Sequence, residues 1–174
     1  MTTTAADNPP VGESSPRFES FEQLYETTRD AIYAYVLGLL RDRDAAEEIT
    51  AQAFERAYRK HGQVDRSRGD ARTWLFGIAR NAALDELRRL RSRPIPTGAD
   101  ELARLGGSQS PDGDADRIAL QQALAALPTR DRELVALKFW AGLNNREIAA
   151  VTGQGESNVG TRLSRIITGL RSAL

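Results

Sequence analysis

The segment Trp74–Arg89, WLFGIARNAALDELRR, carries polar side chains at a spacing that suits nucleic-acid recognition. Asn81, Asp85 and Arg88 recur at i, i+4 and i+7, so on a helix they form one polar stripe. Amide, carboxylate and guanidinium groups are the groups that read base edges and bind phosphates. The alternative is that Asp85 pairs with Arg88 or Arg89 in ordinary salt bridges within the helix.

Helices must position these groups, because apolar residues recur at helical spacing through most of the chain. The apolar face of the segment above consists of Phe76, Ala79, Ala83, Leu87 and Leu90, and Asp70 is its expected N-cap. An earlier helix begins at Phe18. Another begins near Asp44, where Asp44 as N-cap and Glu47 would form a capping box. The expected apolar side of that helix is Ile49, Ala53, Phe54, Ala57 and Tyr58. No alternating pattern predicts strands, so the expected fold is all-α.

The C-terminal part has the spacing of a helix-turn-helix. Asn144 is a suitable N-cap, Glu147 completes a capping box, and Gly153 permits a tight turn before a helix from about Glu156 to Arg171. The core face of that helix is predicted to be Val159, Leu163, Ile166 and Leu170. Its other face, which could reach base edges or phosphates, holds Ser157, Asn158, Thr161, Arg162 and Arg165. The alternative is a helical hairpin with a solvated basic face.

Charge is unevenly distributed along a chain whose net charge is zero. Residues 1–55 carry −7 and residues 56–93 carry +7, whereas residues 94–116 carry −4 and residues 117–174 carry +4. Two basic blocks separated by an acidic one favour two contacts with a polyanion.

The composition also excludes several classes of function. There are no cysteines, so disulfides, thiolate metal sites and thiol nucleophiles are excluded, and the single histidine, His61, argues against a catalytic triad. No apolar run is long enough to cross a membrane, and the first residues do not resemble a signal peptide. We therefore expect a cytoplasmic protein without membrane insertion, cofactor, metal or catalytic residues.

Composition divides the chain into four parts. Residues 1–16 are predicted to be a disordered tail, and residues 17–93 a first small helical domain. Residues 94–116 are acidic and rich in proline and glycine, which predicts a flexible linker. Residues 117–174 form a second helical domain, which contains the helix-turn-helix.

Two segments resemble a known family. The pattern Trp-Leu-x-x-Ile-Ala-Arg-Asn-x-x-x-Asp-x-x-Arg from Trp74 to Arg88 resembles region 2 of bacterial RNA polymerase sigma factors, above all the extracytoplasmic-function (ECF) group. The segment LAALPTRDRELVALKFWAGLNNREIAAVTG resembles region 4 of the same family. The resemblance implies a protein that binds core RNA polymerase and directs promoter recognition, DNA melting and transcription initiation. Gly160 departs from the family, which often has Lys or Arg there to contact phosphate.

The resemblance implies three binding surfaces. The surface for the minus-ten element and the melted strand would comprise His61, Arg66, Arg68, Arg72, Asn81, Asp85, Arg88 and Arg89. The surface for the minus-thirty-five element would be the polar face Ser157, Asn158, Thr161, Arg162 and Arg165. The surface for the beta-prime clamp helices of the polymerase would comprise Asp44, Glu47, Glu48 and Gln52. For Glu47 and Glu48 the alternative role is to complement the positive end of the helix dipole, and the sequence favours neither role. For residues 61–69 the alternative is a solvated loop without a binding role, which is equally compatible with the sequence.

The family also implies that the second domain docks on the polymerase beta flap and that an anti-sigma factor binds the protein and could hold it at the membrane. The acidic linker either imitates RNA in the polymerase or is a simple spacer. One rival function is a stand-alone helix-turn-helix regulator that binds duplex DNA without polymerase. Another is a helical adaptor or antagonist, against which the Arg-rich third helix argues. Trp74 is expected to be a core residue beside the site, and Trp140 to pack between helices.

Overall fold

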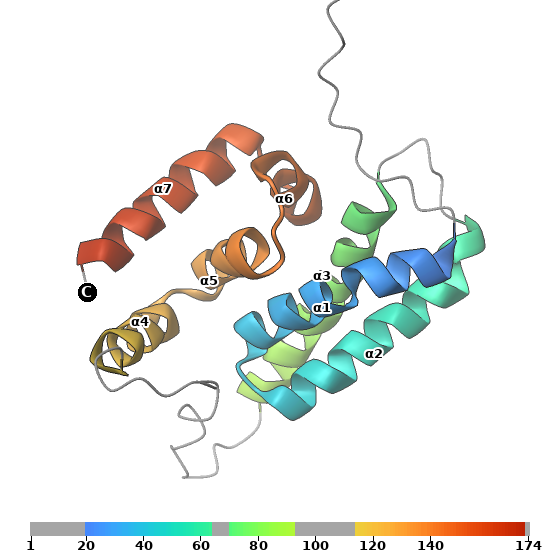
Figure 1. The fold of residues 1–174 in the computed structure, drawn as a ribbon, viewed down its shortest axis with the longest axis horizontal. Helices are drawn as coiled ribbons and strands as arrows, with labels where there is room; N and C mark the ends of the chain where they lie inside the picture. The colour runs from blue at the N-terminus through green and yellow to red at the C-terminus, as the bar shows by residue number, and fades with distance from the viewer. Residues whose placement is uncertain (1–19, 64–69, 93–113, 173–174) are drawn as a thin grey trace, which may run out of the picture.

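The computed structural model describes residues 20–63, 70–92 and 114–172 (Figure 1). No described residue lies in a strand, which confirms the all-α class. The helices of the first half are α1 (Phe21–Leu40), α2 (Arg43–Lys60) with a following 3₁₀ turn η1 (His61–Gln63), and α3 (Ala71–Arg91). The second half contains α4 (Asp114–Ala126), α5 (Thr129–Val135), a π-helical segment (Ala136–Trp140), α6 (Asn145–Thr152) and α7 (Glu156–Ser172).

A connection of only two residues joins α1 to α2. Arg41 takes a left-handed conformation (φ 60°), and its N–H donates to Leu37 O at 2.8 Å, which ends α1. Asp42 is then extended, and its side chain accepts from Ala45 N at 2.9 Å. The prediction that Asp44 caps α2 is therefore wrong: the tight connection places Asp42 at the cap, and Asp44 lies in the first turn.

The local predictions for α3 are confirmed. Asp70 is its N-cap and accepts from Arg72 N, although at a long 3.3 Å. On the predicted apolar face, Phe76, Ala79 and Ala83 are fully buried, and Leu87 and Leu90 are half-buried. The stripe of Asn81, Asp85 and Arg88 is exposed.

The helix-turn-helix also forms as predicted. Asn144 and Glu147 form a reciprocal capping box at the start of α6, and Gly153 ends that helix with a φ of 71°. On α7, Val159, Leu163 and Ile166 are buried and Leu170 is half-buried.

Other boundaries also differ from prediction. Helix α1 begins at Phe21, after an extended Ser20 that is its N-cap, and not at Phe18. Asp114 already starts α4, so the last residues of the predicted linker are helical. Apolar periodicity between Pro128 and Gly142 predicts one regular helix over Thr129–Trp140, but the second part of this segment is π-helical. A π turn inserts one extra residue into a helix, which periodicity does not reveal. The predicted tail and residues 94–113 of the linker lie outside the described residues.

The two halves pack against each other rather than standing apart. Helices α1, α2 and α3 pack together, α5 and the π segment lie against α1, and α6 lies against α3 (Figure 1). Helix α7 packs on α5 and α6, on the side away from the three-helix unit (Figure 1). The buried apolar residues of both halves form one continuous cluster.

Candidate nucleic-acid interface

The polar stripe of α3 is both exposed and internally paired. Arg88 Nη1 lies 2.5 Å from Asp85 Oδ1, although 72% of the Arg88 side chain is exposed. Arg89 holds the buried Glu86 through two hydrogen bonds of 2.6 Å, and these bonds raise the pKa of its guanidinium. The geometry is compatible with both predicted roles, nucleic-acid binding and salt bridges within the helix. The stripe faces solvent, and the arginines on and beside it have carboxylate partners one turn away.

An aromatic group lies at the end of α2 and includes His61, which was assigned to the surface for the melted strand. The exposed ring of His61 stacks on Tyr58, with centroids 5.1 Å apart and an interplanar angle of 24°, and it lies 5.7 Å from Phe21. Tyr58 was expected on the apolar side of α2, yet 57% of it is exposed. Exposed aromatic rings are the surfaces on which unstacked bases pack, so Tyr58 joins the candidate site. Arg66 and Arg68 lie outside the described residues.

Arg72 is directed at the second half of the chain rather than at solvent. Its Nη2 donates to Ala141 O at 2.8 Å, its Nη1 lies 3.9 Å from Glu147 Oε1, and its guanidinium lies 5.7 Å from the Phe76 ring centroid. In this arrangement Arg72 is a contact between the halves.

The outer face of α7 presents four exposed side chains, namely Ser157, Asn158, Thr161 and Arg165. Arg162 is half-buried, because its Nη2 lies 2.8 Å from Asp131 Oδ1 of α5. Gly160 does not belong to this face: a Cβ there would lie 3.3 Å from Asn145 Nδ2 of α6. The glycine thus allows α6 and α7 to approach closely, a role that the comparison with Lys or Arg in the family did not reveal.

The acidic face of α2 is the third predicted surface. Asp44, Glu47 and Glu48 are exposed, and Gln52 Nε2 donates to Glu48 Oε1 at 3.1 Å. The four side chains lie within little more than two turns of one helix, so a partner could contact them together.

A buried ionic group joins the halves, and sequence reasoning missed it. Arg80 of α3 donates to both carboxylate oxygens of Glu133 of α5, at 2.6 and 3.3 Å. The Tyr35 hydroxyl of α1 donates to the same carboxylate at 3.3 Å. Burial, and then the neighbouring Glu133, raise the pKa of Tyr35 well above its ordinary value, so the phenol stays protonated as a donor. Nothing in the local periodicity pairs residues that lie so far apart in the chain.

Trp140 is a further contact between the halves. Its ring lies against Gly38 of α1, where a Cβ would come within 2.7 Å of Cε3. Trp140 thus packs between helices as expected, although 40% of it stays exposed. Trp74 is half-buried and packs against the core, also as expected.

Within the described ranges there is no group of three or more His, Cys, Asp or Glu side chains that could hold a metal ion. None of the described helices combines the length and apolarity needed to cross a bilayer.

Known proteins match this chain along most of its length. The family "Sigma-70 region 2" matches residues 24–93, and "Sigma-70, region 4" matches residues 117–168. The ECF RNA polymerase sigma factor SigC of Mycobacterium tuberculosis is 31% identical over 173 residues, covering 95% of this chain and 91% of the relative. SigL of the same organism is 29% identical over 153 residues, covering 87% of this chain and 86% of the relative.

Solved structures agree on the fold. The sigma factor RpoE of Bartonella quintana, solved with the anti-sigma factor NepR, has a TM-score of 0.67 at 22% identity and covers 88% of this chain and 95% of that one. CnrH, solved with the cytosolic domain of CnrY, has a TM-score of 0.64 at 22% identity and covers 87% and 85%. With both conserved regions present in the order that the family has them, the chain belongs to the ECF group of RNA polymerase sigma factors.

Proposed function

We propose that this sigma factor divides promoter recognition between α3 and α7. The exposed stripe of α3, with the His61 and Tyr58 rings, contacts the minus-ten element and the melted strand. The exposed face of α7 contacts the minus-thirty-five element. One observation carries the proposal: the two helices whose sequences resemble the DNA-reading segments of the family, α3 and α7, each bury an apolar face and present a polar, arginine-bearing face to solvent.

The acidic face of α2 is the proposed contact for the beta-prime clamp helices of core polymerase, and the second half docks on the beta flap. The α2 contact is supported by the exposure of Asp44, Glu47 and Glu48, which lie on a surface that no other described helix covers. An anti-sigma factor is a further proposed partner, in line with the two solved relatives of the same fold.

Binding both promoter elements requires the two halves to separate. Elements about 25 base pairs apart are separated by roughly 85 Å of duplex, at about 3.4 Å per base pair. A compact protein of this length has a radius of gyration of about 16 Å, too small to reach both. Residues 93–113, which connect α3 to α4, can reach about 70 Å when fully extended. The packed arrangement is therefore a resting form, and the promoter complex is open.

Run-off transcription with core polymerase on a promoter library tests the proposal. The full chain should produce new transcripts whose promoters share two spaced elements. With Arg88→Ala, transcription should depend less on the sequence of the minus-ten element. With Arg162→Ala, it should depend less on the sequence of the minus-thirty-five element. Arg59→Ala is a matched control for Arg88, because Arg59 is 74% exposed and pairs with Glu55 at 2.5 Å on α2. Arg171→Ala is the control on α7.

Transcripts that need the chain, and that respond selectively to Arg88→Ala and Arg162→Ala, support the proposal. If the controls impair transcription as much as the test variants, the assignment of α3 and α7 is wrong. If the chain alone binds specific duplex sites and never supports initiation, it acts as a stand-alone regulator instead.

A further inference from the structure

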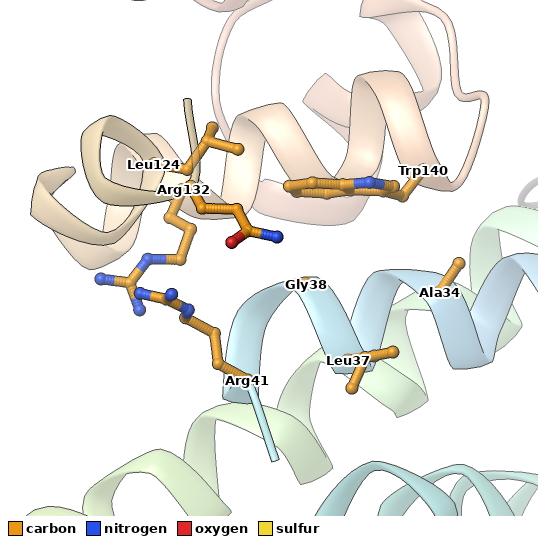
Figure 2. A pocket seen from close by; sticks show the side chains of 8 residues that line it. Ala34, Leu37, Gly38, Arg41, Leu124, Arg132 and Trp140 are labelled. Carbon is orange, nitrogen blue, oxygen red and sulfur yellow. The ribbon is translucent and has the colours of Figure 1, made fainter. Parts of the chain in front are cut away.

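A pocket lies between the two halves, and its lining shares no residue with the proposed DNA surfaces or with the acidic face of α2. Its volume is about 280 Å³, and its walls come from α1 on one side and from α4, α5 and the π segment on the other (Figure 2). The lining residues are Ala34, Leu37, Gly38, Arg41, Gln121, Leu124, Arg132 and Trp140.

Two guanidinium groups meet at one end of this pocket. Arg41 comes from the end of α1 and Arg132 from α5, and their side chains extend toward each other (Figure 2). Neither has a carboxylate partner among the described residues. Within the described ranges, Arg132 donates to the carbonyls of Ala125 and Leu127, and its buried Nε has no acceptor there. Burial lowers the pKa of both groups, and the positive charges of Arg41 and Arg91 lower that of Arg132 further. No described carboxylate offsets this positive charge.

The backbone of Arg41 adds a second indication. Arg41 is the one non-glycine residue with a positive φ among those described. Glycine is the usual residue at such a helix end, because a Cβ is strained in the left-handed region. The chain instead places a guanidinium here, beside another positive charge. The proximity of the two guanidinium groups is unfavourable unless an anion binds between them. The left-handed backbone is a separate cost, of the kind that is retained where the position of a side chain matters for function.

The other walls are apolar. Leu37 and Leu124 face the pocket from opposite halves, and the indole of Trp140 lies over Gly38 (Figure 2). Small-molecule sites combine walls of this kind with a few converging polar groups. The volume lies just below the range of about 300–1,000 Å³ that is usual for such sites, which suits a short aliphatic or aromatic group better than a segment of a protein partner.

We propose that this pocket binds a small organic anion, with a carboxylate or phosphate held by Arg41 and Arg132 and an apolar body packed against Leu37, Leu124 and Trp140. Guanidinium groups bind both kinds of anion through paired, charge-assisted hydrogen bonds. Because the walls come from both halves, the ligand binds the packed form and stabilises it. This consequence rests on the proposed function, in which the packed form is the resting one: the ligand is then an inhibitor of initiation.

Calorimetric titration of the full chain tests the binding. Octanoate and octyl phosphate are the two anionic probes, and their relative affinities decide between the two head groups. Octanol, octylammonium and inorganic phosphate are the controls for charge and for the apolar body. At least one anionic probe should bind once per chain and raise the unfolding temperature, whereas the three controls should bind at least about tenfold more weakly.

Two variants locate the site. Arg41→Gly removes the guanidinium but supplies the residue that the left-handed backbone favours, so the chain should stay folded while affinity falls about tenfold or more. Ala34→Leu fills the pocket with an apolar group and should weaken binding while both arginines remain. Arg29→Gln is the matched control, because Arg29 lies on the same helix, is exposed and pairs with Asp30.

The outcomes separate this inference from the proposed function. Binding that is lost in Arg41→Gly and Ala34→Leu but kept in Arg29→Gln supports the site, whether or not the chain supports transcription. The absence of binding by both anions at millimolar concentration, or equal binding by Arg41→Gly, overturns it even if the chain initiates transcription normally. If inorganic phosphate binds as tightly as octyl phosphate, the apolar part of the proposal is wrong. In run-off assays the bound anion should reduce initiation by the parent chain and not by Arg41→Gly.

Discussion

Arg80 and Glu133 form a bidentate ion pair across the boundary between the two halves, with Nε 2.6 Å from Oε1 and only 3% of the Glu133 side chain exposed. A carboxylate this deeply buried depends on its partner, because removal of one member of a buried pair leaves an uncompensated charge. Solvent becomes available to Glu133 only when the halves separate. The ion pair thus makes the packed arrangement depend on one arginine.

Arg80→Ala should therefore open the molecule. Of its described partners, the buried Glu133 carboxylate would keep the Tyr35 hydroxyl alone. The free energy of the packed form should rise by about 3 kcal/mol relative to that of the open form. Small-angle scattering should show a larger radius of gyration, while circular dichroism shows the same helix content. Arg59→Ala, at an exposed pair on α2, is the control. An unchanged radius in Arg80→Ala would mean that the ion pair does not hold the halves together.

Gly38→Ala should displace Trp140. A Cβ at this position would lie 2.7 Å from Cε3, so the indole must move even though alanine favours the helix. The fluorescence of Trp140, taken as the difference from a Trp140→Phe chain, should shift toward that of a solvated indole. Gly77→Ala is the control, because Gly77 lies inside α3 where a Cβ would meet nothing within 4 Å. This substitution should raise the free energy of unfolding by about 1 kcal/mol, since alanine favours the helix. Identical spectra for the parent and Gly38→Ala would contradict the close contact.

Asn144→Ala should destabilise the helix-turn-helix. The Asn144 side chain accepts from Glu147 N at 2.9 Å, and the Glu147 carboxylate accepts from Asn144 N at 2.8 Å. Loss of the cap in Asn144→Ala should lower the free energy of unfolding in urea by about 1 kcal/mol, whereas Asn144→Gly should lower it by only a few tenths of a kcal/mol. Equal costs for alanine and glycine would show that the side chain acts through another contact.

Asp131→Asn should strengthen binding to the minus-thirty-five element. The substitution releases Arg162 from a carboxylate 2.8 Å away. A pair of this exposure is worth up to about 1 kcal/mol, so affinity should rise by up to roughly fivefold in a filter-binding assay with polymerase holoenzyme. In the Arg162→Ala background the same substitution should have no effect. A gain that persists without Arg162 would come from the reduced negative charge alone.

The sequence predicted the elements of this fold well, because their signals are local. The spacing of apolar residues identifies the helices, and Asp70 and Asn144 are caps because a short polar side chain precedes a periodic run. The cap of α2 was placed two residues too late, since Asp42 and Asp44 are equally suitable by type. What decides between them is the left-handed backbone of Arg41, which periodicity does not indicate.

The contacts between the halves could not be predicted in this way. Arg80 lies among the residues of the family pattern, and Glu133 in a short helix of the second half, with nothing local that pairs them. The same holds for Trp140 and Gly38, since a helical glycine signals a close approach without naming its partner. The polar faces of α3 and α7 were predictable, but the engagement of Arg72 and Arg162 depends on tertiary packing.

The paired arginines of the DNA-facing helices affect how strongly this protein should respond to salt. Arg88, Arg89 and Arg162 each carry a fixed carboxylate counter-ion, in Asp85, Glu86 and Asp131. When a phosphate replaces the carboxylate, the freed acid recruits a cation from solution, which offsets one of the cations released from the DNA. The logarithm of affinity should then fall less steeply with salt than the number of arginines implies. Genomic DNA of arbitrary sequence would also attract the free protein only weakly, so that most of it stays available for polymerase.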